Sequence, residues 1–524
     1  MKKLSLLLII SITLIFASEC LIMVDLTEER LAPFAENDLK VVQELENSAI
    51  LLVDCADFDK LASHSYEILD SSPEEGRYYL VRALDPASDL SVYGEILWKE
   101  GDDYLLKIDV GLLESLMKQR VMLKRMTLKP IIIKNEATPL QFRTDSTVQE
   151  IIDLIDPDSI LASVQRLQDF VTRYSFTDSC VAAADWIVGR FTDYGCDSVF
   201  LHYHTGGQAP NVIAVKHGVV HPDNVYVIIC GHFDSTSFID PWNEAPGADD
   251  NASGTTSALE AARVMQNYEF EYSIRFCAWS GEEQGLYGSD AYASYVYSQG
   301  DSIIAVLNAD MIAYTDILPE SIEVIAKISN PACGWLADFF IAAADSYATL
   351  LTKKTMTSYW PWSDHSSFWD KNYPAILNIE DDLPLPNPYY HLPGDTIGGG
   401  YNNNNFCTET IKAMIATLAL LAVPYHPDPG VEEFGDVVSN TPQLRIYPSL
   451  GSSRFTISFT NTSDTEATLK IYDVSGKLVR TLLQPSPVEW TGIDDFGKKV
   501  PAGIYVVRLE MGELSTAEKL IVLK

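Results

Sequence analysis

The sequence is short of cysteine, of positive charge and of long apolar runs. Its 524 residues include eight cysteines, and none of them forms the Cys-x-x-Cys spacing of thiol redox and zinc-thiolate sites. The 37 Lys and Arg residues face 73 Asp and Glu residues, which gives a formal net charge of −36. Because so acidic a chain repels phosphate backbones, we expect no nucleic-acid partner. Beyond the N-terminus no stretch reaches the roughly 18 apolar residues of a transmembrane helix, and we expect no membrane span.

The N-terminus has the layout of a secretory signal peptide. A basic start at residues 1–3 precedes a mostly apolar run over residues 4–16, and small residues follow it. We therefore expect residues 1–19 to be a signal peptide and the protein to be secreted or at the cell surface. Cys20 raises a lipoprotein alternative, for which Glu19 is a poor neighbour.

Composition divides the rest of the chain into four parts. Residues 20–144 carry mixed helix and strand signals, including a helical pattern over Leu112–Met122, and form either a pro-region or an accessory domain. Residues 145–424 alternate strand and helix signals, and residues 425–443 are a linker rich in Pro, Asp and Gly. Residues 444–524 alternate apolar and polar side chains between turns, which predicts a small β-sandwich.

The part over 145–424 predicts an α/β fold with a mostly parallel sheet and helices on both faces. The small N-terminal domain is expected to be α+β. The apolar strand-like runs are Val225–Cys230, Ile274–Trp279, Ile303–Leu307 and Ala375–Ile379. Helical patterns cover Ile160–Tyr174, Ser253–Gln266, Leu286–Tyr297, Ala332–Ala344 and Thr408–Leu421. A further helix over Val181–Phe191 separates Cys180 from Cys196, which either pair across it or remain free thiols.

Histidines and carboxylates follow these predicted strands. In chain order they are His232 and Asp234, Asp249 and Asp250, Glu282 and Glu283, Asp310, and later His391 and Asp395. Because ligands of such sheets bind beyond the carboxyl ends of the strands, we expect these side chains to meet at one edge.

Two histidines with several carboxylates, and no cysteine, suit zinc, with Co²⁺ or Mn²⁺ as substitutes. A carboxylate that uses both oxygens can bridge two metals about 3.5–4 Å apart. An unligated carboxylate beside them can remove a proton from water, and Glu282–Glu283 offers a ligand next to a base. Taken singly, a Glu-Glu pair is usually a solvated face and Asp249–Asp250 a helix N-cap. The ordered set of five such elements favours the metal interpretation.

These residues stand in phrases that resemble metallopeptidase family 28, the dizinc exopeptidases that include bacterial leucyl aminopeptidases. The phrases are GHFDS, GADDNASG, EEQGLYGS, Asn308-Ala309-Asp310 and YHLPGDT. The resemblance implies that His232 and Asp310 bind one zinc, that Glu283 and His391 bind the other, and that Asp249 bridges them. It further implies that Glu282 is the general base, that Asp234 and Asp395 orient the two histidines, and that a cis peptide follows Asp249.

By the same resemblance the protein is a zinc aminopeptidase whose substrates are peptides with a free N-terminus. The loop that contains Ser363-Asp364-His365 resembles the family's specificity loop, where a tyrosine can stabilise the oxyanion. Here Trp360 stands at that position, with Tyr359 beside it, so the oxyanion donor is undetermined. The aromatic residues of this loop favour an apolar first residue in the substrate.

Three alternatives remain at this level: a carboxypeptidase, a glutaminyl cyclase, and a non-catalytic receptor-like binder on the same fold. The C-terminal part, with Trp490, Gly497 and Tyr505, resembles the immunoglobulin-like domains of exported bacterial enzymes. Some of these are Por-type sorting signals, which would make secretion machinery a partner; a simple β-sandwich spacer is the other interpretation.

Overall fold

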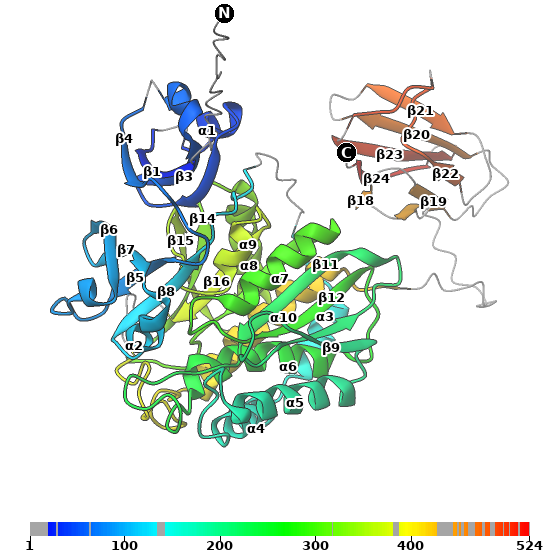
Figure 1. Ribbon diagram of the computed structural model, residues 1–524. Coiled ribbons are helices and arrows are strands. Elements are labelled where there is room, and N and C mark those ends of the chain that lie inside the picture. The colour runs from blue at the N-terminus through cyan, green and yellow to red at the C-terminus, as the bar shows by residue number, and fades with distance from the viewer. Residues whose placement is uncertain are drawn as a thin grey trace, which may run out of the picture. The chain divides into compact units, whose positions relative to one another are not determined.

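Figure 1 shows the computed structural model. It describes residues 19–426 except 28–29, 62–63, 134–141, 317 and 381–386, and residues 444–522 except 448–449, 452–454, 460–466, 474–476, 483–487, 496, 502 and 512–513. The predicted signal peptide up to residue 18 and the predicted linker from residue 427 onward lie outside these residues. The chain forms two compact units, Met1–His426 and Pro427–Lys524, and each is described by itself.

The first unit begins with two antiparallel sheets of four strands. Their orders are β2-β3-β1-β4 and β6-β7-β5-β8. The strands are β1 (Glu19–Asp25), β2 (Lys40–Glu44), β3 (Ser48–Asp54), β4 (Tyr66–Asp70), β5 (Tyr78–Ala83), β6 (Gly94–Glu100), β7 (Asp103–Ile108) and β8 (Val121–Met126), with short helices α1 (Ala32–Glu36) and α2 (Leu113–Met117). We call residues 19–133 the N-terminal region.

The helix predicted over Leu112–Met122 is wrong in its second half. Helix α2 ends at Met117, and the chain is extended from Val121 onward, where it pairs with β5. Val121 and Leu123 are buried on one face of β8, so the apolar run alternates with period two once it reaches the sheet. A short apolar run fits both the helical period and the alternation of a strand, and pairing with a neighbouring strand selects the extended form.

An eight-stranded sheet forms the centre of the first unit, in the order β15-β14-β16-β13-β11-β12-β10-β9. Strands β12, β11, β13 and β16 are mutually parallel, whereas β9, β10 and β14 join through antiparallel pairs. The strands are β9 (Ser198–His202), β10 (Asn211–Lys216), β11 (His221–His232), β12 (Tyr272–Trp279), β13 (Ser302–Ala309), β14 (Ser321–Lys327), β15 (Leu351–Thr357) and β16 (Ala375–Glu380). The predicted α/β class is confirmed, as a mixed rather than wholly parallel sheet.

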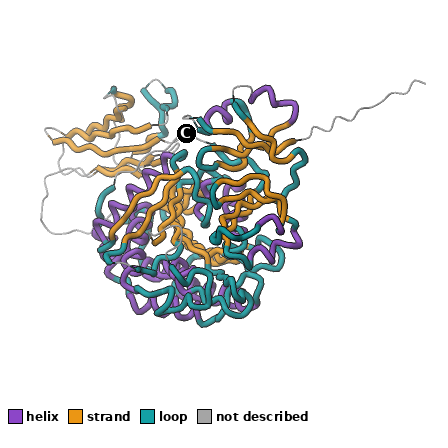
Figure 2. Tube along the Cα trace, turned by 90° about the vertical axis from the view of Figure 1, so that its left-hand side faces the viewer, coloured by secondary structure: helices purple, strands orange, loops and turns teal. Residues whose placement is uncertain are grey.

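Helices cover this sheet, as the purple and orange tubes in Figure 2 show. They are α3 (Ser146–Asp153), α4 (Pro157–Gln168), α5 (Asp178–Asp193), α6 (Gly254–Met265), α7 (Tyr287–Gln299), α8 (Pro331–Tyr347), α9 (His365–Trp369) and α10 (Asn404–Ala422), with a π-helical turn η4 (Ala248–Ser253) before α6. Helix α10 packs with α6 and α8, and α7 packs with α9. Among the described residues, α10 is long and apolar enough to cross a membrane, but 83% of its most apolar window is buried, as in a core helix.

The beginning and the end of the segment from residue 145 to residue 426 lie side by side. The Asp145 N–H donates to the Tyr347 hydroxyl at 2.7 Å, and this hydroxyl donates to the Asp145 carbonyl at 3.1 Å. His426 Nε2 lies 3.7 Å from Asp145 Oδ2. Residue 145, which precedes α3, is therefore adjacent to residue 426, where the first unit ends.

The second unit contains the predicted β-sandwich. Its two sheets have the orders β17-β19-β22 and β18-β24-β23-β20-β21. The strands are β17 (Leu444–Tyr447), β18 (Leu450–Gly451), β19 (Phe455–Phe459), β20 (Ala467–Asp473), β21 (Leu478–Leu482), β22 (Val488–Trp490), β23 (Gly503–Met511) and β24 (Leu514–Val522). One buried cluster around Phe455, Trp490 and Tyr505 fills the space between the sheets.

Candidate active site

The strand ends of the central sheet place the candidate residues together. His232 ends β11, Glu282 and Glu283 follow β12, and Asp310 follows β13 directly. Because β11, β12 and β13 are parallel neighbours, their carboxyl ends open at one edge. The turn η4 and the loop before α10 add an aspartate and His391 from the same side.

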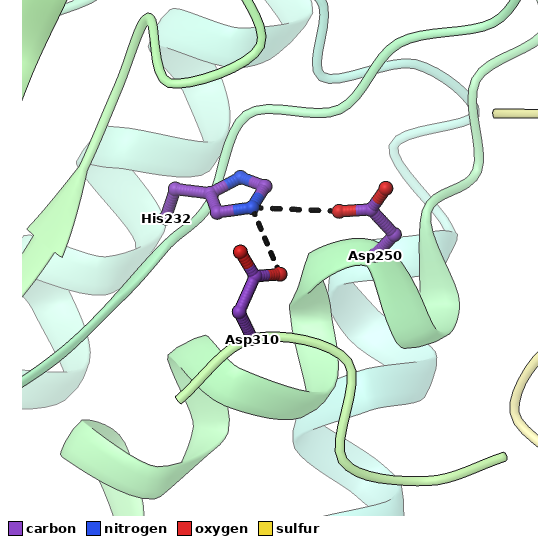
Figure 3. Close-up of side chains that lie close together, drawn as sticks. All are labelled: His232, Asp250 and Asp310. Carbon is purple, nitrogen blue, oxygen red and sulfur yellow. Dashed lines mark hydrogen bonds and ion pairs between the residues drawn. The ribbon is translucent and has the colours of Figure 1, made fainter. Parts of the chain in front are cut away.

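Two groups of three ligand atoms meet at this edge. His232 Nε2 lies 3.4 Å from Asp250 Oδ1 and 3.4 Å from Asp310 Oδ1, as Figure 3 shows. His391 Nε2 lies 2.8 Å from Glu283 Oε2 and 3.1 Å from Asp250 Oδ2. Within each group the ligand atoms lie within 4.8 Å of one another. Asp250 belongs to both groups, with one oxygen turned toward each histidine.

The structure corrects the assignment of Asp249 as the shared carboxylate. Its Oδ1 accepts the Ala313 N–H at 2.9 Å, and its Oδ2 accepts the Asn387 amide at 2.9 Å, away from both histidines. The backbone of η4 departs from helical angles at Asp250. The side chain that faces the site is that of Asp250, one residue after Asp249. The cis peptide bond likewise lies at Asp250–Asn251, one residue later than expected.

The residues present fit a pair of zinc ions. Each group combines one imidazole nitrogen with carboxylate oxygens, the donor set that zinc accepts in proteins. Glu283 Oε1 is buried and has no hydrogen-bond donor among the described residues, and the two oxygens of Asp250 face the histidine nitrogens. Burial raises the pKa of Glu283 to about 7; the carboxylate of Asp250 adds to this shift, and His391 opposes it. A divalent cation would satisfy these oxygens.

The buried carboxylates and the histidines shift one another's pKa values. Burial alone lowers the pKa of His391, but Glu283 and Asp250 outweigh it and raise the pKa to about 10. Burial opposes ionisation of Asp250, yet its contacts with His232 and His391 lower its pKa overall. The raised pKa of His391 thus reports how strongly negative its carboxylate surroundings are, and such surroundings attract a cation.

Glu282 lies beside the two groups without joining either. Its Oε2 is 4.0 Å from His232 Nε2, and its side chain is almost fully buried. Burial raises its pKa well above the ordinary value, and His232 only partly opposes this shift. A raised pKa makes a carboxylate a stronger proton acceptor, which suits a general base.

The two supporting aspartates act differently from each other. Asp234 Oδ1 lies 3.6 Å from His232 Nδ1, the placement expected of a residue that orients this imidazole. Asp395, by contrast, accepts the backbone N–H groups of Asp249 and Asp250 at 2.9 and 3.0 Å. The expected contact with His391 is wrong: its Nδ1 has no hydrogen-bond partner among the described residues. Asp395 holds the η4 turn instead.

A small cavity of about 30 Å³ adjoins the two groups. Its apolar wall is made by Met122, Met311, Trp360, Trp362, Ile379 and Tyr390. Tyr390 stacks on His391 with ring centroids 3.7 Å apart, and surrounding carboxylates together with burial raise the pKa of its hydroxyl. Tyr359, in contrast, packs against Trp362 and is not one of the residues that line this cavity. Tyr390 is thus the tyrosine among the described residues that line this cavity.

Arg173 is a supporting residue that sequence reasoning missed. It is fully buried and donates to the carbonyls of Phe233, Leu167, Pro246 and Gly247 at 2.6–3.0 Å. It thereby ties the segment after His232 to the segment before Asp250. Gly247 has φ +53, and a Cβ there would lie 2.4 Å from the Asp250 carbonyl, so the turn requires glycine. A single arginine outside any motif gave no sequence signal.

Cys180 in α5 and Cys196 after this helix do not pair. Cys180 and Cys196 are both free thiols in the structure. Burial raises the pKa of Cys196 to about 12, so its thiol is unreactive at neutral pH.

Known proteins resemble both the fold and the sequence. The LapA aminopeptidase of Legionella pneumophila matches with a TM-score of 0.56 and 20% identity, over 67% of this chain and 100% of that one. LapB of the same organism matches with a TM-score of 0.50 and 20% identity, over 77% of this chain and 99% of that one.

Curated relatives are similar over the same part of the chain. Leucine aminopeptidase 1 of Sclerotinia sclerotiorum is 29% identical over 289 residues, which is 51% of this chain and 73% of the relative. A probable aminopeptidase of Saccharomyces cerevisiae is 28% identical over 274 residues, 49% of this chain and 72% of the relative.

The fold is thus the large mixed α/β sheet of the aminopeptidase structures, with a cluster of histidines and carboxylates at its strand ends. The model of peptidase family M28 matches residues 211–415, and that of the FlgD Ig-like domain matches residues 442–513. The chain contains an M28 peptidase domain followed by a FlgD Ig-like domain.

Proposed function

We propose that the protein is a zinc aminopeptidase that removes N-terminal residues from peptides. The observation that carries this proposal is the pair of histidine–carboxylate groups joined by Asp250, with Glu282 unligated beside them. The similarity to leucine aminopeptidases supports the same activity. His232 and Asp310 would hold one zinc, Glu283 and His391 the other, and Asp250 both.

Bound zinc would supply the Lewis acidity for amide hydrolysis. Glu282 takes a proton from the attacking water and delivers it to the leaving amine. Tyr390 lines the same cavity, and in this proposal its hydroxyl donates a hydrogen bond to the oxygen of the scissile carbonyl as charge develops there. Asp234 holds the imidazole of His232, and Asp395 and Arg173 hold the turn that presents Asp250.

The cavity wall favours a free α-amine and an apolar first residue. Acidic groups form one side and apolar side chains the other, and its described lining includes no lysine or arginine. A carboxypeptidase needs a cation to hold the substrate carboxylate, so the lining favours the aminopeptidase. A glutaminyl cyclase that binds one zinc would need only one of the two ligand groups. A non-catalytic binder would not need the buried, unligated Glu282.

We further propose export of the protein, with the FlgD Ig-like domain as a sorting or spacer element and no part in the chemistry. The predicted signal peptide and the resemblance of the C-terminal part to domains of exported enzymes support this proposal. Fractionation of the producing cells, with and without residues 444–524, tests it.

The activity is tested with alanyl and leucyl p-nitroanilides beside their N-acetylated forms. We expect hydrolysis of free-amine substrates only, about two zinc ions per chain, and a loss of at least 10³-fold in kcat in Glu282→Gln with zinc retained. Glu269→Gln, on an exposed segment, serves as the control. Hydrolysis of the acetylated substrates, or full activity of Glu282→Gln, would refute the proposal.

A further inference from the structure

The N-terminal region contributes a wall to the candidate active site. Met122 on β8 lines the same cavity as His232, His391 and Glu282. It lies outside the segment matched by the M28 family model, residues 211–415. Met122 is the one lining residue from the N-terminal region among those described, and it faces the space next to the reacting groups.

Strand β8 is fixed at this position by its neighbours. The buried Lys124 Nζ lies 2.9 Å from Asp370 Oδ2, and Arg125 Nη2 lies 3.0 Å from Asp290 Oδ2. The Arg125 N–H also donates to the Gly285 carbonyl at 3.2 Å. A Cβ at Gly285 would lie 2.9 Å from the Arg125 nitrogen, so glycine permits this close approach. Met122 is therefore held by polar contacts two and three residues away.

The same region also contacts the tryptophans that line the cavity. The Arg82 guanidinium on β5 lies 5.3 Å from the ring centre of Trp360 and 5.2 Å from that of Trp362. Asp103 holds this arginine through two hydrogen bonds of 2.7 and 2.8 Å. The walls made by Met122 and by the two tryptophans thus depend on the N-terminal region.

The size of the cavity limits what these walls admit. Its volume of about 30 Å³ is room for about two water molecules. A leucyl side chain has four carbon atoms and does not fit while Met122 keeps its position. Glycyl and alanyl residues have the smallest side chains and therefore need the least of this space.

We infer that Met122 is a specificity-determining residue, through which the N-terminal region restricts the first substrate residue to small side chains. This inference rests on the proposed aminopeptidase function. It assigns the size limit to a region outside the matched peptidase segment. In the full chain we expect the kcat/KM for alanyl p-nitroanilide to exceed that for leucyl p-nitroanilide at least tenfold.

The test replaces Met122 in the zinc-loaded full chain. Met122→Ala is expected to raise the leucyl kcat/KM at least tenfold and the alanyl kcat/KM less than threefold. Met122→Leu conserves volume and is expected to keep the wild-type ratio. Met23→Ala removes a half-buried methionine of the same region that does not line the cavity, and serves as the control. An unchanged ratio in Met122→Ala, or an equal change in Met23→Ala, would overturn the inference.

A binding measurement separates this inference from the proposed activity. Calorimetry with alanine hydroxamate and leucine hydroxamate reports the same space without turnover. Tighter binding of leucine hydroxamate to Met122→Ala than to wild type, by tenfold or more, supports the wall even if no amide is cleaved. Equal affinities in the two proteins would overturn it, whatever the activity.

Discussion

The carboxylate of Asp395 accepts the backbone N–H of Asp250 at 3.0 Å, and so fixes the residue whose own side chain faces both histidines. Burial raises the pKa of Asp395 to about 7, while the two N–H donors act to lower it. The contact joins the loop before α10 to the turn before α6, so the geometry of the shared ligand depends on both.

Substitution of the two adjacent aspartates should have unequal effects. Asp250→Asn removes the carboxylate common to both groups, and we expect bound zinc to fall below one ion per chain and activity to fall at least 10³-fold. Asp249→Asn keeps the hydrogen-bond acceptor toward Ala313, and we expect it to retain most of the zinc. Zinc content by plasma emission and alanyl p-nitroanilide hydrolysis check this. Equal zinc loss in both variants would contradict the assignment of Asp250.

Loss of the Tyr390 hydroxyl should lower kcat more than it changes KM. We expect Tyr390→Phe to lose about 10²-fold in kcat, the usual effect of removing one oxyanion donor. Steady-state kinetics on alanyl p-nitroanilide measure both constants. Tyr389→Phe, at an exposed position next to it, should leave kcat unchanged. A Tyr390→Phe enzyme with wild-type kcat would assign the donor elsewhere.

Arg173 should matter for stability as well as for activity. Arg173→Met leaves four buried carbonyls without their donor, and we expect a loss of about 3 kcal/mol in the free energy of unfolding. Urea denaturation followed by tryptophan fluorescence measures this loss. Arg166→Met removes an exposed arginine that stacks on Phe170 and should change it by less than about 0.5 kcal/mol. Similar losses in the two variants would contradict a special role for Arg173.

Glu271 should make stability depend on pH. Burial raises its pKa to about 7, and its Oε2 has no hydrogen-bond donor among the described residues. The folded state therefore binds the proton more tightly than the unfolded state, and stability falls as pH rises from about 4.5 to 7. Glu271→Gln should stabilise the protein above pH 7, on the order of 1–2 kcal/mol, and have little effect below pH 4.5. Thermal unfolding at pH 4.5 and 8 measures the difference, with Glu269→Gln as the control. If Glu271→Gln raised stability equally at both pH values, the raised pKa of buried Glu271 could not be the cause.

The sequence predicted the sheet and most of the residues at its edge, because polar motifs directly follow buried apolar strands. His232, Glu283, Asp310 and His391 lie together as the motif order indicated. The sequence could not show whether Asp249 or Asp250 faces the site, since this depends on the backbone angles inside η4.

Other features depend on contacts that have no local pattern. Arg173 acts through carbonyls up to 74 residues away, and Asp395 acts through the backbone of a distant turn. Met122 belonged to a run with both helical and strand character, and only pairing with β5 places it over the cavity.

Because Asp145 and His426 are adjacent, the segment from residue 145 to residue 426 begins and ends at nearly the same place. Its entry and exit share one point, so a chain could pass through this fold and resume beside the place where it left. A circular permutant that joins 426 to 145 needs only a short linker across this junction.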